Sequence, residues 1–478
     1  MERLMKKILL INEKKEFENV SAGWPHLGLV SIATVLKRAG FTVRVIDYAF
    51  LKNSQPLNNI IKIYNPDVIG FSLYTTTWSK YDKILNDIER VFKGVVIVGG
   101  PHATLYYKDL LEDKRIDYIF KGEAEEKIVE VCSKCVKNEI PEIIECGFVD
   151  VKEMEWIDYS VADQYEKIEE VGIQLERGCP FNCSFCSVRK ISSRRVRYRK
   201  IQTCIQELHE CKKIMPKLES VRIVDDCPSF HLEKFKEFVR AFIQDFPELR
   251  INIQHLRADQ VDEEMLLLLK KARVRSFTLG VESANPEVFK YVDKGESLEE
   301  IEQTALLVKK IGVPLTLAFV IGLPESTYEK EKDSLDFAKR IKPREIYWNM
   351  CLPHKGTRVW DWYQENGTIY EGRNPSTLID FNLEFDSPRA ETPQFSIYER
   401  ERAWVRAVLE TKSFRFRFSL LPRIFELGRK YELMPSVASL FLNSNNLKLI
   451  CRDIALHILK STGLLETVRR YWYTFKYQ

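Results

Sequence analysis

The chain has 478 residues and a formal net charge of +4, with 45% hydrophobic and 30% charged residues. This composition is that of a globular protein with about two to four domains, and it excludes an intrinsically disordered chain. The small net charge gives no support to a nucleic-acid partner, and no apolar run reaches the length of a transmembrane segment. We therefore expect a cytoplasmic protein, whose 11 reduced cysteines serve metal binding or burial.

The first third of the chain alternates short apolar runs with amphipathic segments. Such alternation predicts an α/β domain with a parallel sheet covered by helices on both faces. Five units of this kind fit a flavodoxin-like doubly wound sheet, which binds ligands at the carboxyl ends of its strands. The apolar runs are 8–11, 43–46, 68–71, 95–98 and 117–120.

The loops after these runs are rich in glycine and small hydroxyl residues, which let a large ligand approach the backbone closely. A nucleotide is an alternative ligand, but no G-x-G-x-x-G follows the first run. The candidate binding residues in these loops are Leu27, Gly28, Ser72, Leu73, Tyr74, Thr75, Gly99, Gly100, His102, Gly122 and Glu123.

Cys132 and Cys135 form a C-x-x-C in a helical pattern. Such a pair can bind a metal or cycle between redox states. No second pair lies nearby, so we expect an ordinary surface helix. Residues 136–168, with Pro141, Gly147 and mixed charge, are expected to form a linker.

Three cysteines, Cys179, Cys183 and Cys186, follow the apolar stretch 172–175 with the spacing C-x3-C-x2-C. Thiolates are soft ligands, and this spacing lets one loop wrap an iron–sulfur cluster. In a four-iron cluster, three cysteines leave one iron open for another ligand. A structural zinc site is the alternative, but it needs a fourth Cys or His, and none lies between Ser187 and Lys200.

Six further strand patterns alternate with helical ones as far as residue 357. They predict a partial (β/α)6 TIM barrel, with its chemistry at the carboxyl ends of the strands. Beyond residue 357 the pattern becomes mainly helical, with helices expected at 399–411 and 450–467. The six strand patterns are 173–175, 220–224, 251–254, 276–283, 315–322 and 345–350.

Two basic segments each have two interpretations. Residues 194–200 could form a nucleic-acid patch, but a role in packing or in holding an anion near the cysteines is favoured. The alternating aromatic and basic residues 413–422 could touch a membrane surface or a lipid-like substrate, but an ordinary amphipathic element with solvated arginines is favoured.

The cysteine motif, with Phe185 just before its last cysteine, and the ordered loops of the first third resemble the cobalamin-binding radical SAM enzymes over residues 5–360. The resemblance implies a [4Fe-4S] cluster on the three cysteines, S-adenosylmethionine (SAM) on the open iron, and cobalamin. It also implies four parts: a cobalamin-binding domain at 1–135, the linker at 136–168, the radical SAM barrel at 169–360 and a mainly helical substrate cap at 361–478.

The same resemblance suggests which residues contact SAM. Glu282 and Ser283 match the position that contacts ribose, and the segment 320–325 matches the one whose backbone meets adenine. Arg257 either pairs with the SAM carboxylate or forms a salt bridge at the barrel rim. Asp225 and Asp226 stand where the family has Gly-Gly-Glu, so the group that holds the SAM amine stays open. The expected SAM-binding residues are Phe185, Arg257, Glu282, Ser283, Ile321 and Gly322.

One departure concerns cobalt. Some cobalamin proteins carry a D-x-H-x-x-G motif whose histidine ligates the metal, but residues 12–25 contain no histidine. We therefore expect no protein histidine on cobalt, and His102 is expected near the corrin without binding cobalt.

The resemblance implies reductive cleavage of SAM to a 5′-deoxyadenosyl radical, hydrogen abstraction from an unactivated carbon and methyl transfer from methylcobalamin. An oxidoreductase or cyclase without methyl transfer is one alternative, and a non-catalytic sensor is another. The expected partners are a small-molecule or lipid-like substrate and a low-potential electron donor such as flavodoxin or ferredoxin.

Overall fold

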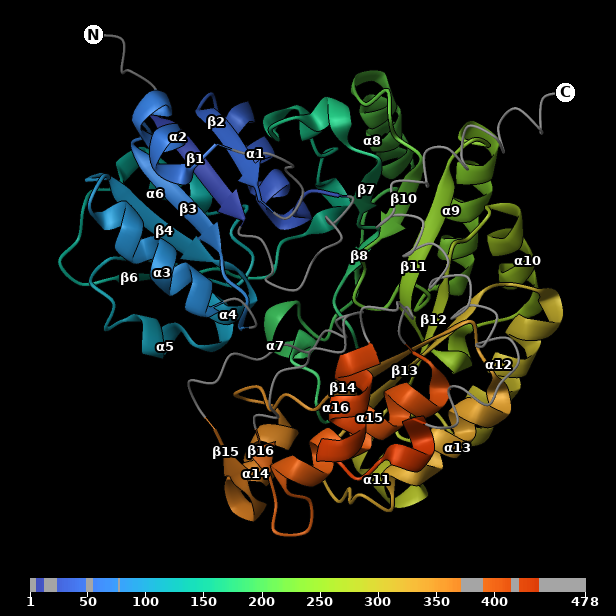
Figure 1. The fold of residues 1–478 in the computed structure, drawn as a ribbon. Coiled ribbons are helices and arrows are strands. Elements are labelled where there is room, and N and C mark those ends of the chain that lie inside the picture. Colours follow the sequence, from blue (N-terminus) through green and yellow to red (C-terminus); the bar gives the residue numbers. More distant parts are fainter. Residues whose placement is uncertain are drawn as a thin grey trace, which may run out of the picture.

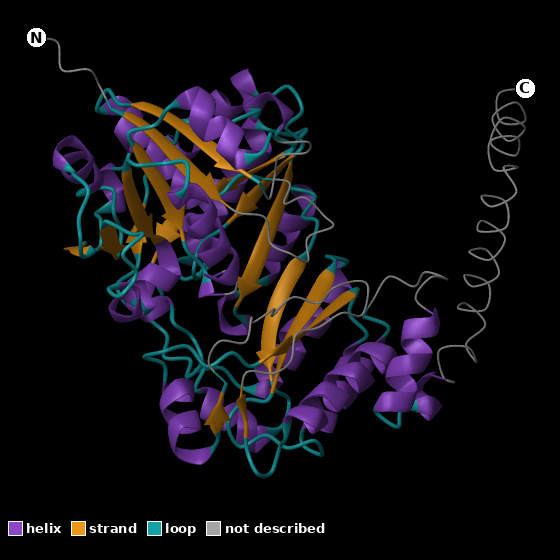
Figure 2. Ribbon diagram, turned by 60° about the vertical axis from the view of Figure 1, so that its left-hand side comes forward, coloured by secondary structure: helices purple, strands orange, loops and turns teal. Residues whose placement is uncertain are grey.

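The computed structural model describes residues 6–12, 24–48, 55–75, 78–370, 390–413 and 421–437. These residues form two six-stranded parallel sheets, each with its own helices, followed by a smaller helical part (Figure 1). Figure 2 shows the strands of the two sheets as two groups covered by helices.

The first sheet has the strand order β2-β1-β3-β4-β5-β6, and every pairing is parallel. Alternate residues of β1 point to opposite faces: Ile8 and Leu10 pack with α1 and α6, whereas Leu9 and Ile11 pack with α2 and α3. The doubly wound prediction is confirmed. The elements are β1 (Lys7–Asn12), α1 (Leu27–Arg38), β2 (Thr42–Asp47), α2 (Leu57–Tyr64), β3 (Val68–Ser72), α3 (Trp78–Glu89), β4 (Val95–Gly99), α4 (Gly100–Leu105), α5 (Tyr107–Leu110), β5 (Tyr118–Lys121), α6 (Ile128–Lys134) and β6 (Glu142–Glu145).

Strand β6 lies inside residues 136–168, which were expected to form a linker. It pairs with β5 over Tyr118–Lys121, so the first sheet continues past residue 135. Its sequence Glu-Ile-Ile-Glu holds only two apolar residues, and neither is fully buried. A short strand at a sheet edge needs little core, so it leaves only a weak apolar signal.

The second sheet has the order β14-β13-β12-β11-β10-β7, again all parallel. Strands β7 and β14 end the sheet and do not pair with each other, so it forms the partial barrel that was predicted. The first strand begins at Glu170, before the predicted start. The elements are β7 (Glu170–Ile173), α7 (Val188–Ile191), α8 (Ile201–Ile214), β10 (Ser220–Ile223), α9 (Leu232–Asp245), β11 (Arg250–Leu256), α10 (Glu263–Lys271), β12 (Phe277–Glu282), α11 (Pro286–Val292), α12 (Leu298–Ile311), β13 (Leu315–Ile321), α13 (Glu331–Ile341) and β14 (Glu345–Met350), with the hairpin of β8 (Glu176–Arg177) and β9 (Arg197–Tyr198).

The C-terminal part begins with α14 (Arg358–Asn366), the short pair β15 (Thr368–Ile369) and β16 (Ala390–Glu391), and then α15 (Ile397–Thr411) and α16 (Leu421–Lys430). Trp404 of α15 donates a hydrogen bond to the carbonyl of Trp348 in β14 at 2.8 Å. Helix α15 therefore packs on the outer face of the barrel, as a barrel helix does. The helix expected at 450–467 and most of the 413–422 run lie outside the described residues. Among the described helices, none combines the length and the apolar character needed to cross a bilayer.

Candidate functional site

A cavity of about 480 Å³ lies where the carboxyl end of the first sheet meets the barrel. Part of its wall comes from the barrel domain, through Gln174, Arg177, Ile191, Ser192 and Val224. The first sheet supplies most of the predicted cobalamin residues to the other wall, namely Leu27, Gly28, Ser72, Tyr74, Gly99, Gly100, Gly122 and Glu123.

Glycine is required at two points of this wall. Gly100 has a φ of +91°, and a Cβ there would lie 2.7 Å from Ser72 Oγ. Gly122 has a φ of +105°, and a Cβ there would lie 2.5 Å from the carbonyl oxygen of Cys146. Both loops therefore stay close to the sheet end and leave room in front of it, which suits a large flat ligand such as a corrin.

Three predicted residues do not line the cavity but support its loops. The buried Leu73 accepts a hydrogen bond from the His102 backbone at 2.9 Å. The His102 ring stacks between Trp78 and Tyr106, with centroid distances of 5.1 and 4.6 Å, and its Nδ1 lies 3.1 Å from Thr75 Oγ1. These contacts are those of a packed loop residue.

His26 lines the cavity and is not among the predicted site residues. Its Nδ1 caps α1 by accepting from the Leu29 N–H at 3.1 Å. A neutral imidazole that accepts at Nδ1 carries its proton on Nε2, which is then a donor and cannot bind a metal. The cap thus agrees with the expectation that no histidine ligates cobalt. The sequence signal was its position before the helix-opening Leu27.

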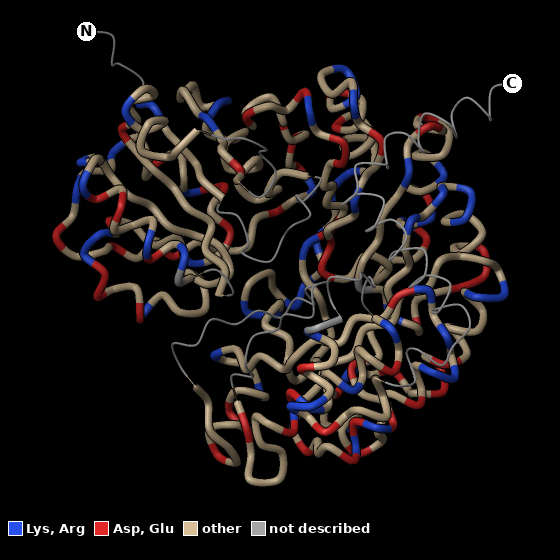
Figure 3. Tube along the Cα trace, in the orientation of Figure 1, with Lys and Arg blue, Asp and Glu red and all other residues tan. Residues whose placement is uncertain are grey.

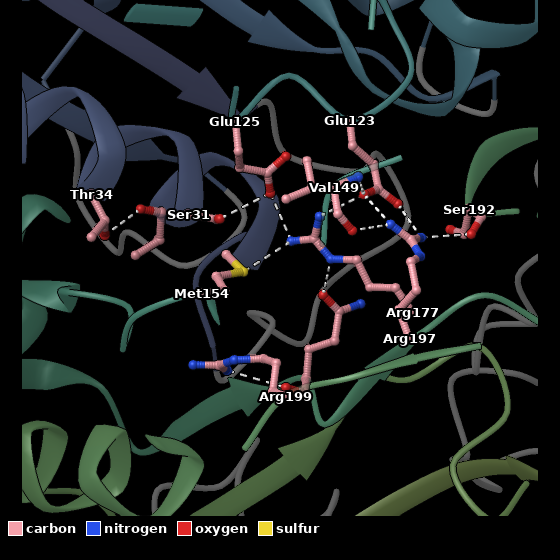
Figure 4. A network of polar contacts seen from close by, with 12 residues as sticks. Ser31, Thr34, Glu123, Glu125, Val149, Met154, Arg177, Ser192, Arg197 and Arg199 are labelled. Carbon is pink, nitrogen blue, oxygen red and sulfur yellow. Dashed lines mark hydrogen bonds and ion pairs between the residues drawn. The ribbon is translucent and has the colours of Figure 1, made fainter. Parts of the chain in front are cut away.

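A buried ionic network joins the two domains at the edge of the cavity (Figure 4). Arg177 contacts Glu125 at 2.7 Å and Glu123 at 3.3 Å. Arg197, its neighbour across the β8–β9 hairpin, binds both oxygens of Glu123, at 2.6 and 2.7 Å. Burial raises the pKa of the Glu125 carboxyl, but the charge and hydrogen bond of Arg177 outweigh it and lower that pKa overall. Glu123 therefore acts as a bridge between domains as well as part of the cavity wall.

The cysteine loop begins two residues after Arg177 and lies at the carboxyl end of β7. Its backbone is fixed at both ends: the Cys179 N–H donates to Ser193 at 3.1 Å, and the Ser184 N–H donates to Val292 at 2.8 Å. Cys179, Cys183 and Cys186 are all half-buried thiols. Among the residues the structure describes, these thiols do not gather within 4.8 Å of one another. The assignment of these three thiols to a four-iron cluster stays a prediction.

Two carboxylates hold this loop from the end of β10. Asp225 accepts from the Leu175 N–H at 2.7 Å, and Asp226 accepts from the Gly178 N–H at 2.9 Å. Burial raises the pKa of Asp225 to about 8. Because they accept these backbone hydrogen bonds, both side chains anchor the segment that leads into the cysteines. Which group would hold the SAM amine is therefore still an open question.

Cys227, next in sequence, was missed as a candidate. It is buried, and its thiol donates to Gln260 Oε1 at 3.4 Å. Hydrogen bonding with this neighbouring thiol lowers the pKa of Cys179 below its ordinary value. Contact between residues 48 positions apart has no local sequence signal.

The predicted SAM residues lie around the open end of the barrel. Glu282 ends β12 with a φ of +65° and lies 3.5 Å from Lys294. Gly280 must be small there, because the Glu282 carboxylate folds back over it. Ser283 is buried and accepts from the Asn285 N–H at 3.2 Å. Phe185 packs at the edge of a small core beside the cysteine loop. These positions leave the Glu282 carboxylate at a strand end and largely buried, and its contact with ribose stays a prediction.

Arg257 makes the contacts of the rim salt bridge. Its guanidinium binds both oxygens of Asp259, at 2.9 and 2.8 Å, and lies 3.4 Å from the ring centre of Phe181 in the cysteine loop. A contact with the SAM carboxylate stays a prediction.

The backbone at the end of β13 already makes hydrogen bonds within the protein. Ile321 is buried, and the Gly322 N–H donates to Glu331 at 2.9 Å. The Gly322 carbonyl accepts from Tyr363 at 2.5 Å and from Arg400 of α15 at 3.2 Å. Adenine contacts at this segment would have to use other backbone groups.

Two other sequence motifs have structural roles. In the basic run, Arg197 pairs with Glu123, and Arg199 pairs with Glu207 at 2.7 Å inside the protein, which supports the packing interpretation. The prediction of a surface helix for Cys132 and Cys135 is wrong in one respect, because both thiols are buried in the core of the first domain.

Comparisons with known proteins agree with this architecture. Residues 17–132 match the B12 binding domain and residues 173–338 match the radical SAM superfamily. An uncharacterized methyltransferase of Pyrococcus horikoshii is 26% identical over 85% of this chain and 96% of its own length. An anaerobic magnesium-protoporphyrin IX monomethyl ester cyclase of Rubrivivax gelatinosus is 25% identical over 74% of this chain and 68% of its own.

Solved structures share the fold at low identity. The radical SAM methyltransferase TsrM from Kitasatospora setae, with tryptophan and a SAM analogue bound, is 16% identical with a TM-score of 0.65, over 85% of this chain and 89% of that one. The cobalamin-dependent SAM radical enzyme OxsB, with aqua-cobalamin and SAM bound, is 15% identical with a TM-score of 0.64, over 95% of this chain and 75% of that one.

Proposed function

This chain belongs to the radical SAM proteins that also carry a B12-binding domain, and on that premise we propose that it is a C-methyltransferase acting on an unactivated carbon. When bound, the cluster and SAM supply a radical that removes a hydrogen atom, and methylcobalamin supplies a methyl group that a carbon radical can accept. The substrate is expected to be a small or lipid-like molecule, in a cytoplasmic setting.

The observation that carries the proposal is that the cavity of the first sheet reaches the segment that leads into the cysteine loop. Gln174 and Arg177 line the cavity of the first sheet, and Cys179 follows Arg177 by two residues. A cobalamin in the cavity and a cluster on the loop would face one common space. This arrangement suits a reaction in which a radical formed at one cofactor meets a methyl group held by the other.

The chain's own residues would position and enclose these groups. Gly100 and Gly122 leave space for the corrin, the network around Arg177 fixes the cysteine loop beside it, and Glu282 offers a carboxylate to ribose. Residues of both domains build the cavity wall, so both would enclose part of a bound cobalamin.

The test uses anaerobically reconstituted protein with cobalamin and SAM that carries a deuterated methyl group. We expect reductant-dependent release of 5′-deoxyadenosine and a three-deuterium mass shift in the recovered methylcobalamin. With the substrate present, one S-adenosylhomocysteine and one 5′-deoxyadenosine should form for each methylated product. A product without the mass shift would contradict methyl transfer.

The cyclases among the relatives favour one alternative, a ring-forming or oxidising radical SAM enzyme. It would give 5′-deoxyadenosine with no matching S-adenosylhomocysteine. A non-catalytic sensor would give no 5′-deoxyadenosine under any reducing condition.

A further inference from the structure

Each SAM cleaved in the proposed reaction consumes one electron, which must reach the cysteine loop from outside the chain. We propose that an acidic protein that carries single electrons at low potential docks on the exposed basic surface formed by Lys190, Arg194 and Arg195. The inference rests on the proposed function, because it assumes that a cluster on the loop is reduced during turnover.

This basic surface lies directly on the cysteine loop. The backbone of Ser193 accepts from the Cys179 N–H at 3.1 Å, and Arg194 donates from Nη2 to the carbonyl of Pro180 at 3.3 Å. Gly178 has a φ of +101°, and a Cβ there would collide with the carbonyl of Arg195. Lys190 extends from α7, which begins two residues after Cys186. A protein bound here would therefore lie against the cysteine loop.

The basic residues of this region fall into two groups. Arg197, Arg199 and Lys200 are bound to Glu123, Glu207 and Glu153 at 2.6, 2.7 and 2.7 Å, and they serve the fold. Lys190, Arg194 and Arg195 are exposed, and within the described part of the chain none of them forms an ion pair. Three positive charges therefore stay available to a partner.

Neighbouring carboxylates do not cancel this charge. Asp293 is paired with Arg358 at 2.7 Å, and Asp109 is paired with Lys355 at 2.7 Å. Asp226, below the surface, is buried and bound to the Gly178 N–H. Figure 3 shows basic residues along the trace at α7 and the segment after it. Such a positive surface speeds the association of an acidic partner, most strongly at low ionic strength.

The test compares two ways of reducing the same enzyme. The variant Lys190→Glu/Arg195→Glu reverses the charge of two of the three surface residues. It leaves Arg194, which supports the loop, in place. At low salt we expect flavodoxin-driven formation of 5′-deoxyadenosine to fall about tenfold or more. The rate with dithionite and methyl viologen, and the iron content, should change less than about twofold. Added salt should slow the flavodoxin-driven reaction of the unmodified enzyme, so that its rate approaches that of the variant.

The matched control reverses the charge of two lysines at the other end of the barrel. Lys271 and Lys310 lie in the last turns of α10 and α12, so Lys271→Glu/Lys310→Glu should leave flavodoxin binding and both rates unchanged.

Flavodoxin binding is also measured directly, by calorimetry at low salt. Equal affinity for the unmodified protein and the Lys190→Glu/Arg195→Glu variant would overturn the docking surface. A failure of both reductants to cleave SAM, with flavodoxin binding still lost in the variant, would count against the proposed function alone. If the Lys190→Glu/Arg195→Glu variant lost RNA binding while its flavodoxin affinity and its flavodoxin-driven rate stayed unchanged, the surface would be a nucleic-acid patch. That result would overturn the inference.

Discussion

Arg177 of the barrel domain binds Glu125 of the cobalamin-binding domain at 2.7 Å, and both side chains are about nine-tenths buried. Arg177 also lies two residues before Cys179, the first of the three predicted cluster ligands. One guanidinium thus fixes the distance between the domains and the start of the cysteine loop. Removing one partner of such a buried pair leaves an uncompensated charge.

Arg177→Met is therefore expected to destabilise the protein by about 3–5 kcal/mol. Thermal unfolding measures the loss, and a weaker cobalamin affinity should accompany it. Arg340→Met is the matched control, because its bond to Glu302 at 2.9 Å is exposed and worth about 1 kcal/mol or less. Equal losses in the two variants would contradict the role of the network.

Replacing Cys179, Cys183 and Cys186 together by Ala should abolish iron and sulfide incorporation and SAM cleavage. Cys132→Ala/Cys135→Ala should keep the full iron content, because both thiols are buried in the first domain. Iron and sulfide analysis after anaerobic reconstitution measures both. A complete cluster in the triple variant would refute the assignment.

Cys227→Ala should retain the cluster but lower its midpoint potential by a few tens of millivolts, since hydrogen bonds to ligand sulfur stabilise the reduced cluster. Cys227→Ser keeps a donor beside Cys179, so its midpoint potential should return most of the way to that of the unmodified protein. Redox titration followed by electron paramagnetic resonance gives both values. An unchanged potential in the Ala variant would mean that the thiol contact is lost when iron is bound.

The Co(II) form should show no nitrogen superhyperfine splitting from a protein histidine. His26 uses Nδ1 to cap α1, and His102 is packed between two rings. Electron paramagnetic resonance of the cobalamin-loaded protein tests this. Splitting that vanished in His26→Ala or in His102→Ala would prove the expectation wrong.

Glu331 predicts a pH dependence of stability. Its carboxyl is buried, bonded to Gly322 and Ser326, and burial raises its pKa to about 7 although Arg400 opposes this. An unfolded Glu titrates near about 4.3, so in the window from about pH 4 to 7 the folded chain holds a proton that the unfolded chain has lost. Stability should therefore fall as the pH rises through that window.

Glu331→Gln keeps the acceptor and removes the titration. Its unfolding temperature should vary less than that of the unmodified protein between pH 5 and 8, and should be higher at pH 8. A variant that was less stable at pH 8 would mean that an ionised pair with Arg400 outweighs burial.

The sequence predicted features that depend on neighbours in the chain. Both parallel sheets follow from apolar periodicity, and the three cysteines predict a cluster loop because ligand spacing is local. Strand β6 was missed because an edge strand with two apolar residues carries little pattern. The pairs Arg177–Glu125 and Cys179–Cys227 join residues about 50 positions apart, and only the folded chain brings them together.

The ionic network also limits how the two domains can be recombined. A cobalamin-binding domain taken from a relative would meet Arg177 and Arg197 without their acidic partners, unless it carried acids at the positions of Glu123 and Glu125. The barrel would then hold two buried cations beside the cofactor cavity. Chimaeras of this chain should therefore fold when the incoming domain carries acids at these two positions, or when the loop 122–125 and the β8–β9 hairpin are exchanged as one unit.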